Sequence, residues 1–344
     1  MKPALVTLSP MRRVWVRFIH QRRAFVSLVF FTILFVLSLG AELISYDKPV
    51  LIRYQGEFYS PLVTDYSERF FGGDFDTPAD YHDPWLVKHF DTSKADVYWP
   101  LNPFSFNTID YSQAEPNPAP PSARHWLGTD DRGRDIFARL LYGFRVSVLF
   151  AFALTAIGTF FGVVAGAIQG YFGGYLDLTL QRLIEIWGSL PELYLLILFA
   201  SLFQPSLVLL LILLSLFGWM GLSDYVRGEF LKNRQREYVL AARALGLSNL
   251  QIMWRHVLPN SLTPVITFLP FRISGSILAL TSLDFLGLGV PSETASLGEL
   301  LAQGKENLEA WWISLSVFLV LTCTLLLLIF IGEGLRDALD TRKA

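Results

Sequence analysis

The stretch VSVLFAFALTAIGTFFGVVAGAI, residues 146–168, carries no charged side chain. A helix needs about 20 mostly apolar residues to cross the hydrocarbon core of a bilayer, so this stretch predicts a membrane span. Residues 24–41, 205–223 and 311–331 are equally free of charge. Residues 183–203 and 261–283 are also apolar, although they contain prolines and the ionisable residues Glu185, Glu192 and Arg272. We therefore predict an all-α polytopic membrane protein with six transmembrane helices.

The composition of the chain agrees with a membrane protein. Of its 344 residues, 52% are hydrophobic and 17% are charged, whereas soluble domains have about 25% charged residues. The net charge of −2 argues against a protein that binds nucleic acid. A single cysteine, Cys323, excludes an internal disulfide framework and a cysteine-based zinc site.

Basic residues indicate the orientation. Residues 1–23 contain six Lys and Arg residues and no acid, and residues 224–260 contain six against three acids. The positive-inside rule places both segments in the cytoplasm together with the basic C-terminal tail, so residues 42–145 lie outside. The first span could instead be a signal peptide cleaved near Gly40, but its apolar run is longer than the usual stretch of about 7–15 residues. We expect an uncleaved span, with both termini in the cytoplasm.

The chain divides into four parts on this basis. Residues 1–44 form a cytoplasmic tail and the first span, residues 45–125 a periplasmic insertion, residues 126–335 the core with the other five spans, and residues 336–344 a second cytoplasmic tail. The insertion holds 16 aromatic residues and 10 prolines. The prolines preclude long helices, and the aromatic residues can form a small packed module. The insertion is then either a spacer or a platform for an extracytoplasmic partner.

The cytoplasmic segment 236–260 predicts two short helices joined at a glycine. Alanine and leucine favour helix up to Leu245, and Gly246 suits the left-handed position that ends a helix. Ser248 and Gln251 have the spacing of a capping box, which starts a second helix. Pro259 is expected to end that helix. The small Ala241 and neighbouring Ala242 allow another protein to approach closely; the alternative is an amphipathic pair of helices that lies on lipid.

This segment resembles the EAA loop of ABC importer permeases. When Gly246 is aligned with the glycine of that motif, two alanines and a closing Leu-Pro also match. Leu240 stands where the motif has glutamate, and His256 stands where it has isoleucine. Both departures resemble the peptide/nickel branch. The residues of this loop that the resemblance implies contact an ATPase are Leu240, Ala241, Ala242, Gly246, Leu258 and Pro259.

Two other segments resemble the same branch. They read HWLGTDDRGRD at 125–135 and DFLGLG at 284–289, the latter followed by the Trp pair at 311–312. The long insertion and the sequence GKEN at 304–307 resemble the subgroup that imports larger peptides such as microcin C. The resemblance implies the type I ABC importer permease fold.

The resemblance also implies partners and a location. Such a permease sits in the bacterial inner membrane and pairs with a second permease as a heterodimer. It also works with two cytoplasmic subunits that bind ATP and Mg and with a periplasmic substrate-binding protein. The implied activity is the import of peptides or peptide-like compounds, and loop 236–260 would move with the ATPases.

Glycines and buried charges complete the set of candidate residues. A ladder of glycines every four residues indicates close helix packing, and ionisable or aromatic residues in the spans are candidates for the substrate pathway. Glu185 is expected to line the pathway, or else to pair with Arg182 or Arg272. The ladder is Gly158, Gly162, Gly166, Gly170 and Gly174, and the main pathway candidates are Glu185, Trp187 and Asp284.

The sequence contains no signature of an enzyme. A phosphate-binding loop, an H-E-x-x-H motif and a G-x-S-x-G motif are all missing from it. We therefore expect a chain that hydrolyses nothing by itself and binds no cofactor. The alternative function is a self-contained secondary transporter or channel for small polar solutes, which would usually need an internal repeat or more intramembrane charges.

Overall fold

The computed structural model describes residues 10–111, 113, 115–291 and 293–340. They form two compact units. Unit 1 comprises the described parts of residues 1–33, 147–291 and 321–344, and unit 2 comprises those of 34–146 and 292–320. The elements of unit 1, some of which extend into unit 2, are α1 (Pro10–His20), α2 (Arg22–Leu39), α5 (Ile136–Phe172), α6 (Gly174–Gly188), α7 (Glu192–Leu202), α8 (Leu207–Phe217), α9 (Met220–Asn233), α10 (Glu237–Ala244), α11 (Asn249–Ile252), η3 (Met253–Val257), α12 (Leu258–Phe285) and α14 (Trp311–Leu339). Those of unit 2 alone are α3 (Ala41–Ile44), β1 (Leu51–Tyr54), β2 (Glu57–Tyr59), η2 (Glu68–Phe71), α4 (Pro84–Ser93), β3 (Asp96–Tyr98) and α13 (Leu297–Glu306).

The helices account for the six predicted spans. Five helical stretches within the described residues are long and apolar enough to cross a membrane: Arg22–Leu39, Ile136–Phe172, Leu207–Asn233, Asn249–Phe285 and Trp311–Leu339. The sixth is the pair α6 and α7, which bend by 61° at a short break. Pro191 stands at this break as the residue before α7, because proline lacks the N–H that would continue the helix.

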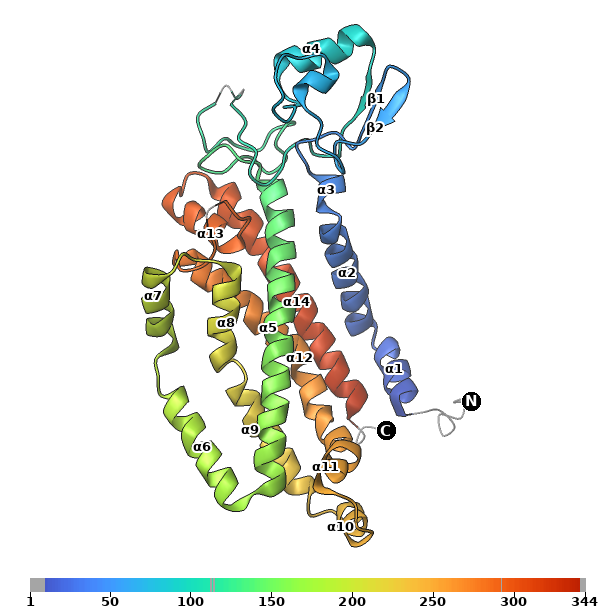
Figure 1. Cartoon of the computed structure of the whole chain (residues 1–344), viewed down its shortest axis with the longest axis vertical. Helices are drawn as coiled ribbons and strands as arrows, with labels where there is room; N and C mark the ends of the chain where they lie inside the picture. Colours follow the sequence, from blue (N-terminus) through green and yellow to red (C-terminus); the bar gives the residue numbers. More distant parts are fainter. Residues whose placement is uncertain (1–9, 112, 114, 292, 341–344) are drawn as a thin grey trace. The chain divides into compact units, whose positions relative to one another are not determined.

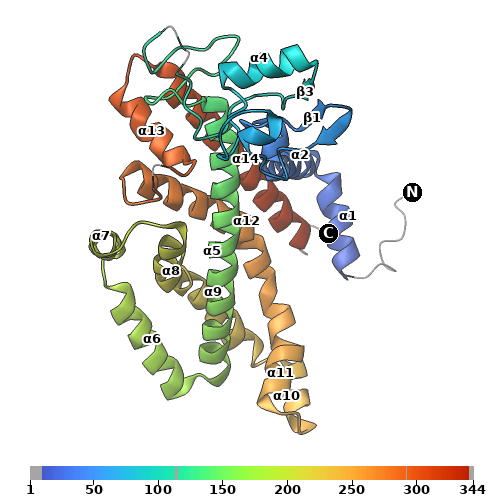
Figure 2. The ribbon, with the colours of Figure 1, turned by 45° about the horizontal axis from the view of Figure 1, so that its top comes forward.

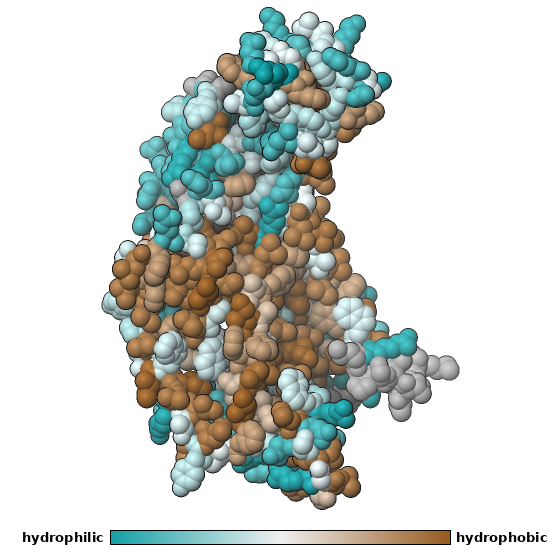
Figure 3. Space-filling view, viewed as in Figure 1, coloured by the Kyte–Doolittle hydropathy of each residue, from teal (hydrophilic) through white to brown (hydrophobic). Residues whose placement is uncertain are grey.

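Unit 1 is a bundle built around α5. Figures 1 and 2 both show α6 and α8 on the same side of α5, and α9 packs beside α12. One core joins Phe150 and Leu154 of α5 to leucines of α7, α8 and α12. Hydrophobic side chains also cover the outside of this bundle (Figure 3), as a surface that faces lipid requires.

Unit 2 contains a small sheet that the sequence analysis did not predict. Its strand order is β2-β1-β3, and both pairs are antiparallel, with Ile52 opposite both Tyr59 and Val97. Strands β1 and β2 form a β-hairpin that turns at Gln55 and Gly56. Both residues have positive φ, as the type I′ turn that is common in two-residue β-hairpins requires. The buried face of the sheet packs on Leu86 and on aromatic residues that include Phe71, Tyr81 and Phe90.

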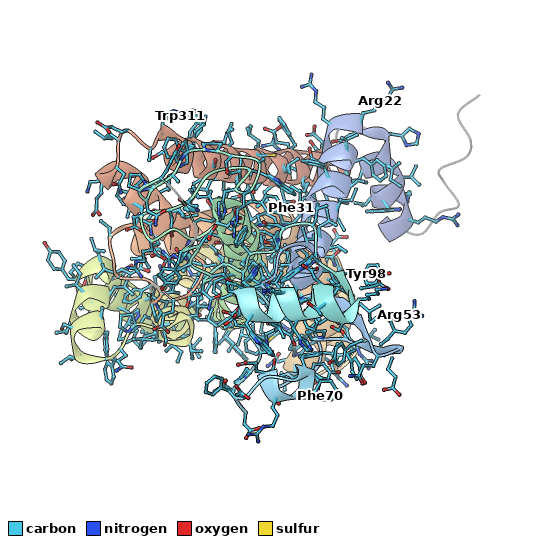
Figure 4. All side chains as sticks on the ribbon, turned by 90° about the horizontal axis from the view of Figure 1, so that it is seen from above. Arg22, Phe31, Arg53, Phe70, Tyr98 and Trp311 are labelled. Carbon is cyan, nitrogen blue, oxygen red and sulfur yellow. The ribbon has the colours of Figure 1, made fainter. Side chains whose placement is uncertain are left out.

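The other face of this sheet is exposed. Arg53 and Tyr98 project together from it (Figure 4). The prediction that prolines exclude long helices agrees with α4, which has only 10 residues and begins at Pro84. Unit 2 also includes residues 126–146 and 292–320, so the insertion folds together with core segments.

The prediction that Pro259 ends a helix is wrong. The stretch Asn249–Phe285 is one helical path through α11, η3 and α12, and Pro259 lies in the first turn of α12. The segment η3 is a π-helix, in which the N–H of Leu258 donates to the carbonyl of Met253, five residues back. A proline is tolerated where the local hydrogen-bond pattern does not need its N–H.

Candidate functional site

The candidate site is the hairpin formed by α10, α11 and η3. Helix α10 ends at Gly246, whose φ is +79°. The N–H of Gly246 donates to the carbonyl of Arg243 at 3.0 Å, and that of Leu247 donates to the carbonyl of Ala242 at 3.2 Å. This pair of bonds is a Schellman motif, as the glycine predicts. The turn between the two helices therefore has a fixed geometry.

The second arm begins at the predicted capping box. The side chain of Ser248 accepts from the N–H of Gln251, and the Gln251 side chain accepts from the N–H of Ser248 at 3.1 Å. These bonds satisfy two amide groups that would otherwise lack partners at the start of a helix. Helix α11 then continues through η3 into α12. The hairpin is thus a direct extension of a membrane span.

One face of the hairpin packs inside unit 1. Val239 and Ala242 of α10 and Ile252 and Val257 of the second arm are buried in a core with residues of α5, α9 and α12. The hydroxyl of Tyr171, at the end of α5, donates to the Asn249 side chain at 2.9 Å. The hairpin is therefore fixed to three spans.

The opposite face of the hairpin is exposed, and we call it the hairpin surface. It combines large apolar side chains with arginines, including Arg243 and Arg255. Ala241 is exposed, whereas Ala242 is buried within this chain, so only the first of the two alanines faces outward. Leu258 is half-buried and Pro259 is exposed. The apolar members of the hairpin surface are Tyr238, Leu240, Leu245, Leu250 and Trp254.

The glycine ladder lies against α9 and the residues just before it. A Cβ atom on Gly158 would lie 3.3 Å from the Gly218 carbonyl, and one on Gly162 would lie 2.9 Å from that of Trp219. Gly166 and Gly170 approach α9 still more closely, at the carbonyls of Ser223 and Arg227. Gly174 differs, since nothing lies within 4 Å of its Cβ position. Four of the five glycines thus allow backbone contact between two helices.

The pathway candidates have local partners. Glu185 forms an ion pair with Arg182, and both side chains are exposed. The Trp187 indole donates to the carbonyl of Leu216 at 3.2 Å, which ties α6 to the end of α8. Asp284, at the end of α12, is buried and accepts from the N–H of Val290 at 2.9 Å.

Arg272 is a charged group in the middle of a span. Its guanidinium donates to the carbonyl of Gly218 at 2.9 Å, and its Nε atom is buried without a hydrogen-bond partner among the described residues. The Gly218 carbonyl follows the last turn of α8, where backbone carbonyls lack helical partners. Arg272 therefore connects α12 to the break between α8 and α9.

Unit 2 contains a buried ionic cluster formed by residues of the motif at 125–135 together with Asp110, Arg139 and Glu299. The imidazole of His125 lies 2.8 Å from a carboxylate oxygen of Asp135 and 3.1 Å from one of Asp110. Burial lowers the pKa of His125, but the two carboxylates outweigh this effect, and the pKa is raised. The guanidinium of Arg134 contacts Asp130 and Glu299, and Arg139 also contacts Glu299. The cluster joins the start of α5 to α13.

Comparison with known families now decides the identity of the chain. Residues 143–344, more than half of the chain, match the family described as binding-protein-dependent transport system inner membrane component. Residues 9–66 match the N-terminal TM domain of oligopeptide transport permease C. The chain belongs to this family of inner membrane permeases.

Full-length relatives agree with this assignment. The permease is 50% identical to the inner membrane ABC transporter permease protein YejE of Escherichia coli K12, over 98% of this chain and 99% of that one. It is 45% identical to the peptidoglycan transport system permease protein YejE of Agrobacterium fabrum, over 99% and 96%. The dipeptide transport system permease protein DppC of Bacillus subtilis is 35% identical, over 70% and 75%.

The fold of the permease is also found in a solved transporter. An inward-facing structure of the MetNI methionine ABC transporter superposes with a TM-score of 0.51, covering 60% of this chain and 98% of that one at 18% identity. This similarity confirms the predicted type I fold. Five of the six predicted spans are found as long apolar helices, and the bent pair α6 and α7 occupies the place of the sixth. The membership of an ABC permease family is likewise confirmed.

Several residues of the site were missed by the sequence analysis. Tyr171 and Asn249 are 78 positions apart, and Arg139 and Glu299 are 160 apart, so no local pattern connects them. Leu245 and Leu250 lie on either side of the glycine turn, and both side chains are exposed. The local sequence does not predict this exposure, so the apolar part of the hairpin surface is seen only in the structure.

Proposed function

We propose that this permease is a membrane-spanning subunit of a peptide importer that partner ATPases drive through the hairpin surface. The observation that carries the proposal is the hairpin itself. It has fixed caps at both arms, an exposed apolar face, and an unbroken helical connection to a span. Binding of a partner to the outer face would therefore move α12 together with the hairpin.

The orientation follows from charge. Arg236, Arg243 and Arg255 surround the hairpin, and the segment before the first span is rich in arginine. The positive-inside rule puts these groups in the cytoplasm, where an ATPase is available. Both termini would then be cytoplasmic, and residues 45–125 would face the periplasm of a bacterial cell.

The permease requires other subunits for transport. A second permease would complete the pathway as a heterodimer, two ATP-binding subunits would hold ATP and Mg, and a periplasmic protein would deliver the substrate. The permease would bind no cofactor and catalyse no reaction of its own. The exposed face of the sheet in unit 2, with Arg53, Phe58 and Tyr98, is the surface we assign to the delivering protein.

Peptides are the substrate class that the relatives support, since their names describe transport of dipeptides, oligopeptides and peptidoglycan. Glu185, Trp187 and Asp284 are our candidates for the pathway. The pair between Glu185 and Arg182 is exposed, and exposed pairs contribute about 0–1 kcal/mol. Arg182 is the residue that the ammonium group of a peptide would replace beside Glu185.

The proposal is tested by cross-linking from the hairpin surface. In a Cys323→Ser background, a photo-cross-linker on Leu245→Cys should join the permease to an ATP-binding subunit in the assembled complex. The matched control is Phe160→Cys, an exposed apolar position on α5, which should give no such product. The proposal would be contradicted if neither position reached an ATPase, or if the purified chain alone moved peptide across liposomes without ATP.

A further inference from the structure

Helix α1 is an amphipathic helix that precedes the first span. At 100° per residue, Val14, Trp15, Phe18 and Ile19 fall on one side of it. Arg13, Arg17 and His20 fall on the other side, and Arg12 lies at the border, next to Ile19. The helix contains no acidic residue. It ends at a break before Arg22, where the N–H of Gln21 donates to the carbonyl of Phe18 at 3.0 Å. Figure 1 accordingly shows α1 and α2 as separate helices.

The apolar side of α1 is only partly buried within the protein. Phe18 is 3% exposed and packs near Gly334, on the last turns of α14. Trp15 stacks on Phe18 with 5.9 Å between ring centroids, yet Trp15 is 51% exposed and Ile19 is 37% exposed. Phe18 therefore anchors α1 to unit 1, while its neighbours remain open to the surroundings at the end of two membrane spans.

The basic side of α1 lacks acidic partners. Arg12, Arg13 and Arg17 form no ion pair among the described residues, and neither do Arg22 and Arg23 at the start of α2. The Nε atom of Arg13 is buried without a hydrogen-bond partner among those residues. Arg22 lies at the outer edge of this helix pair (Figure 4). The segment therefore presents a concentrated positive charge beside an open apolar strip.

A small cleft of about 320 Å³ lies between the start of α2 and α14, and it contains two acids besides Arg22 and Arg23. Glu333 and Asp337 would repel an anion there. The surface suited to an anion is instead the basic side of α1. Because this basic side lies next to the exposed Trp15, it favours a ligand that has both an apolar part and an anionic group.

We propose that α1 lies in the headgroup layer of the bilayer and binds anionic phospholipid. Trp15 and Ile19 would enter the boundary of the acyl chains, and Arg12, Arg13 and Arg17 would contact lipid phosphates. The contact with Gly334 would connect the local lipid composition to the end of α14. This role is independent of the partner ATPases and of the substrate.

Site-directed quenching tests the proposal with the full-length chain. In a Cys323→Ser background, Ile19→Cys carries a bimane label, and the protein is reconstituted into phosphatidylcholine bilayers that contain phosphatidylglycerol. Brominated acyl chains are placed on one lipid or the other at equal mole fraction. Each arginine near the surface favours anionic lipid by about fivefold, so brominated phosphatidylglycerol should quench several-fold more strongly than brominated phosphatidylcholine.

Two comparisons separate binding from loss of structure. The Arg12→Gln/Arg17→Gln variant should lower the preference several-fold but not abolish it, because Arg13 remains, whereas Arg53→Gln/Arg69→Gln, which neutralises two exposed arginines of unit 2, should leave it unchanged. High salt should weaken the preference of the unmutated chain without any substitution. Equal quenching by the two lipids, or no quenching by either, would overturn the proposal.

Discussion

The hydroxyl of Tyr171 donates a 2.9 Å hydrogen bond to the side-chain carbonyl of Asn249. Tyr171 belongs to the last turn of α5, and Asn249 is the first residue of α11. This bond is a polar contact that fixes the second arm of the hairpin to a different span. It joins two elements that the chain separates by 78 positions.

Tyr171→Phe should loosen the hairpin without unfolding the bundle. The lost bond contributes about 1 kcal/mol, so amides 248–252 should exchange hydrogen several-fold faster, and uptake per ATP hydrolysed should fall. Tyr175→Phe is the matched control, since Tyr175 is 91% exposed. Equal exchange in both variants would show that the bond has no role in positioning the hairpin.

Gly246→Val should uncouple ATP hydrolysis from transport. No atom lies within 4 Å of the Cβ position, so the cost arises from the left-handed backbone alone, and it should be about 1–2 kcal/mol. Gly246→Asn should be milder because asparagine tolerates this conformation. Gly228→Val, at an equally open helical position on α9, is the control. Unchanged uptake by Gly246→Val at matched expression would contradict the assignment of this turn.

Gly166→Leu should destabilise the bundle. A Cβ atom at this position would overlap the backbone of Ser223 and lie 2.8 Å from the Cβ of Val226, and overpacking costs about 1–3 kcal/mol or more. The thermal midpoint in detergent should therefore drop by several degrees. Gly275→Leu meets no neighbour within 4 Å and should leave the midpoint nearly unchanged in the isolated chain.

The stability of unit 2 should fall as pH rises. The folded pKa of His125 lies above its ordinary value of 6.5, so the folded state binds this proton more tightly than the unfolded state. The resulting stabilisation is complete below pH 6.5 and is lost as the pH passes the raised pKa. Thermal melts between about pH 5.5 and pH 9 measure this slope. His125→Gln should flatten it, and His20→Gln, at an exposed position, should not.

Removal of the sheet should impair substrate delivery more than assembly. The whole insertion is too much to delete, because Asn102 and Asp110 bond to the ionic cluster and Tyr142 donates to the carbonyl of Ser45. Residues 51–98 can be replaced by a short linker, since the N–H of Val50 already contacts the carbonyl of Tyr98 at 2.9 Å. If the binding protein delivers peptide normally to this variant, the sheet is a spacer.

Sequence patterns predicted the parts of the permease that local chemistry controls. The turn at Gly246 and the capping box at Ser248 each depend on residues within a few positions, so their geometry follows from the sequence. The spans follow from the length of their apolar runs. The rule that proline ends a helix failed at Pro259, because the preceding π-helix changes which amides need partners.

Contacts between distant segments could not be predicted in this way. The only local pattern that indicates the sheet of unit 2 is the dipeptide Gln55-Gly56, which is a weak signal for a β-hairpin. Arg139 is buried in the ionic cluster because Glu299 neutralises it, and nothing near either residue identifies the other. Ala242 is buried because the hairpin folds back on α9, which depends on the tertiary structure.

The π-helix at Met253–Val257 determines which way the hairpin surface points. It holds one residue more than an α-helical turn needs, and each residue in an α-helix advances the direction of side chains by about 100°. Deleting one residue from this segment would restore regular winding and rotate Leu250 by roughly that angle about the axis of α12. Such a variant would keep every residue of the hairpin surface, but Leu250 would point in a different direction from the one it has in this structure.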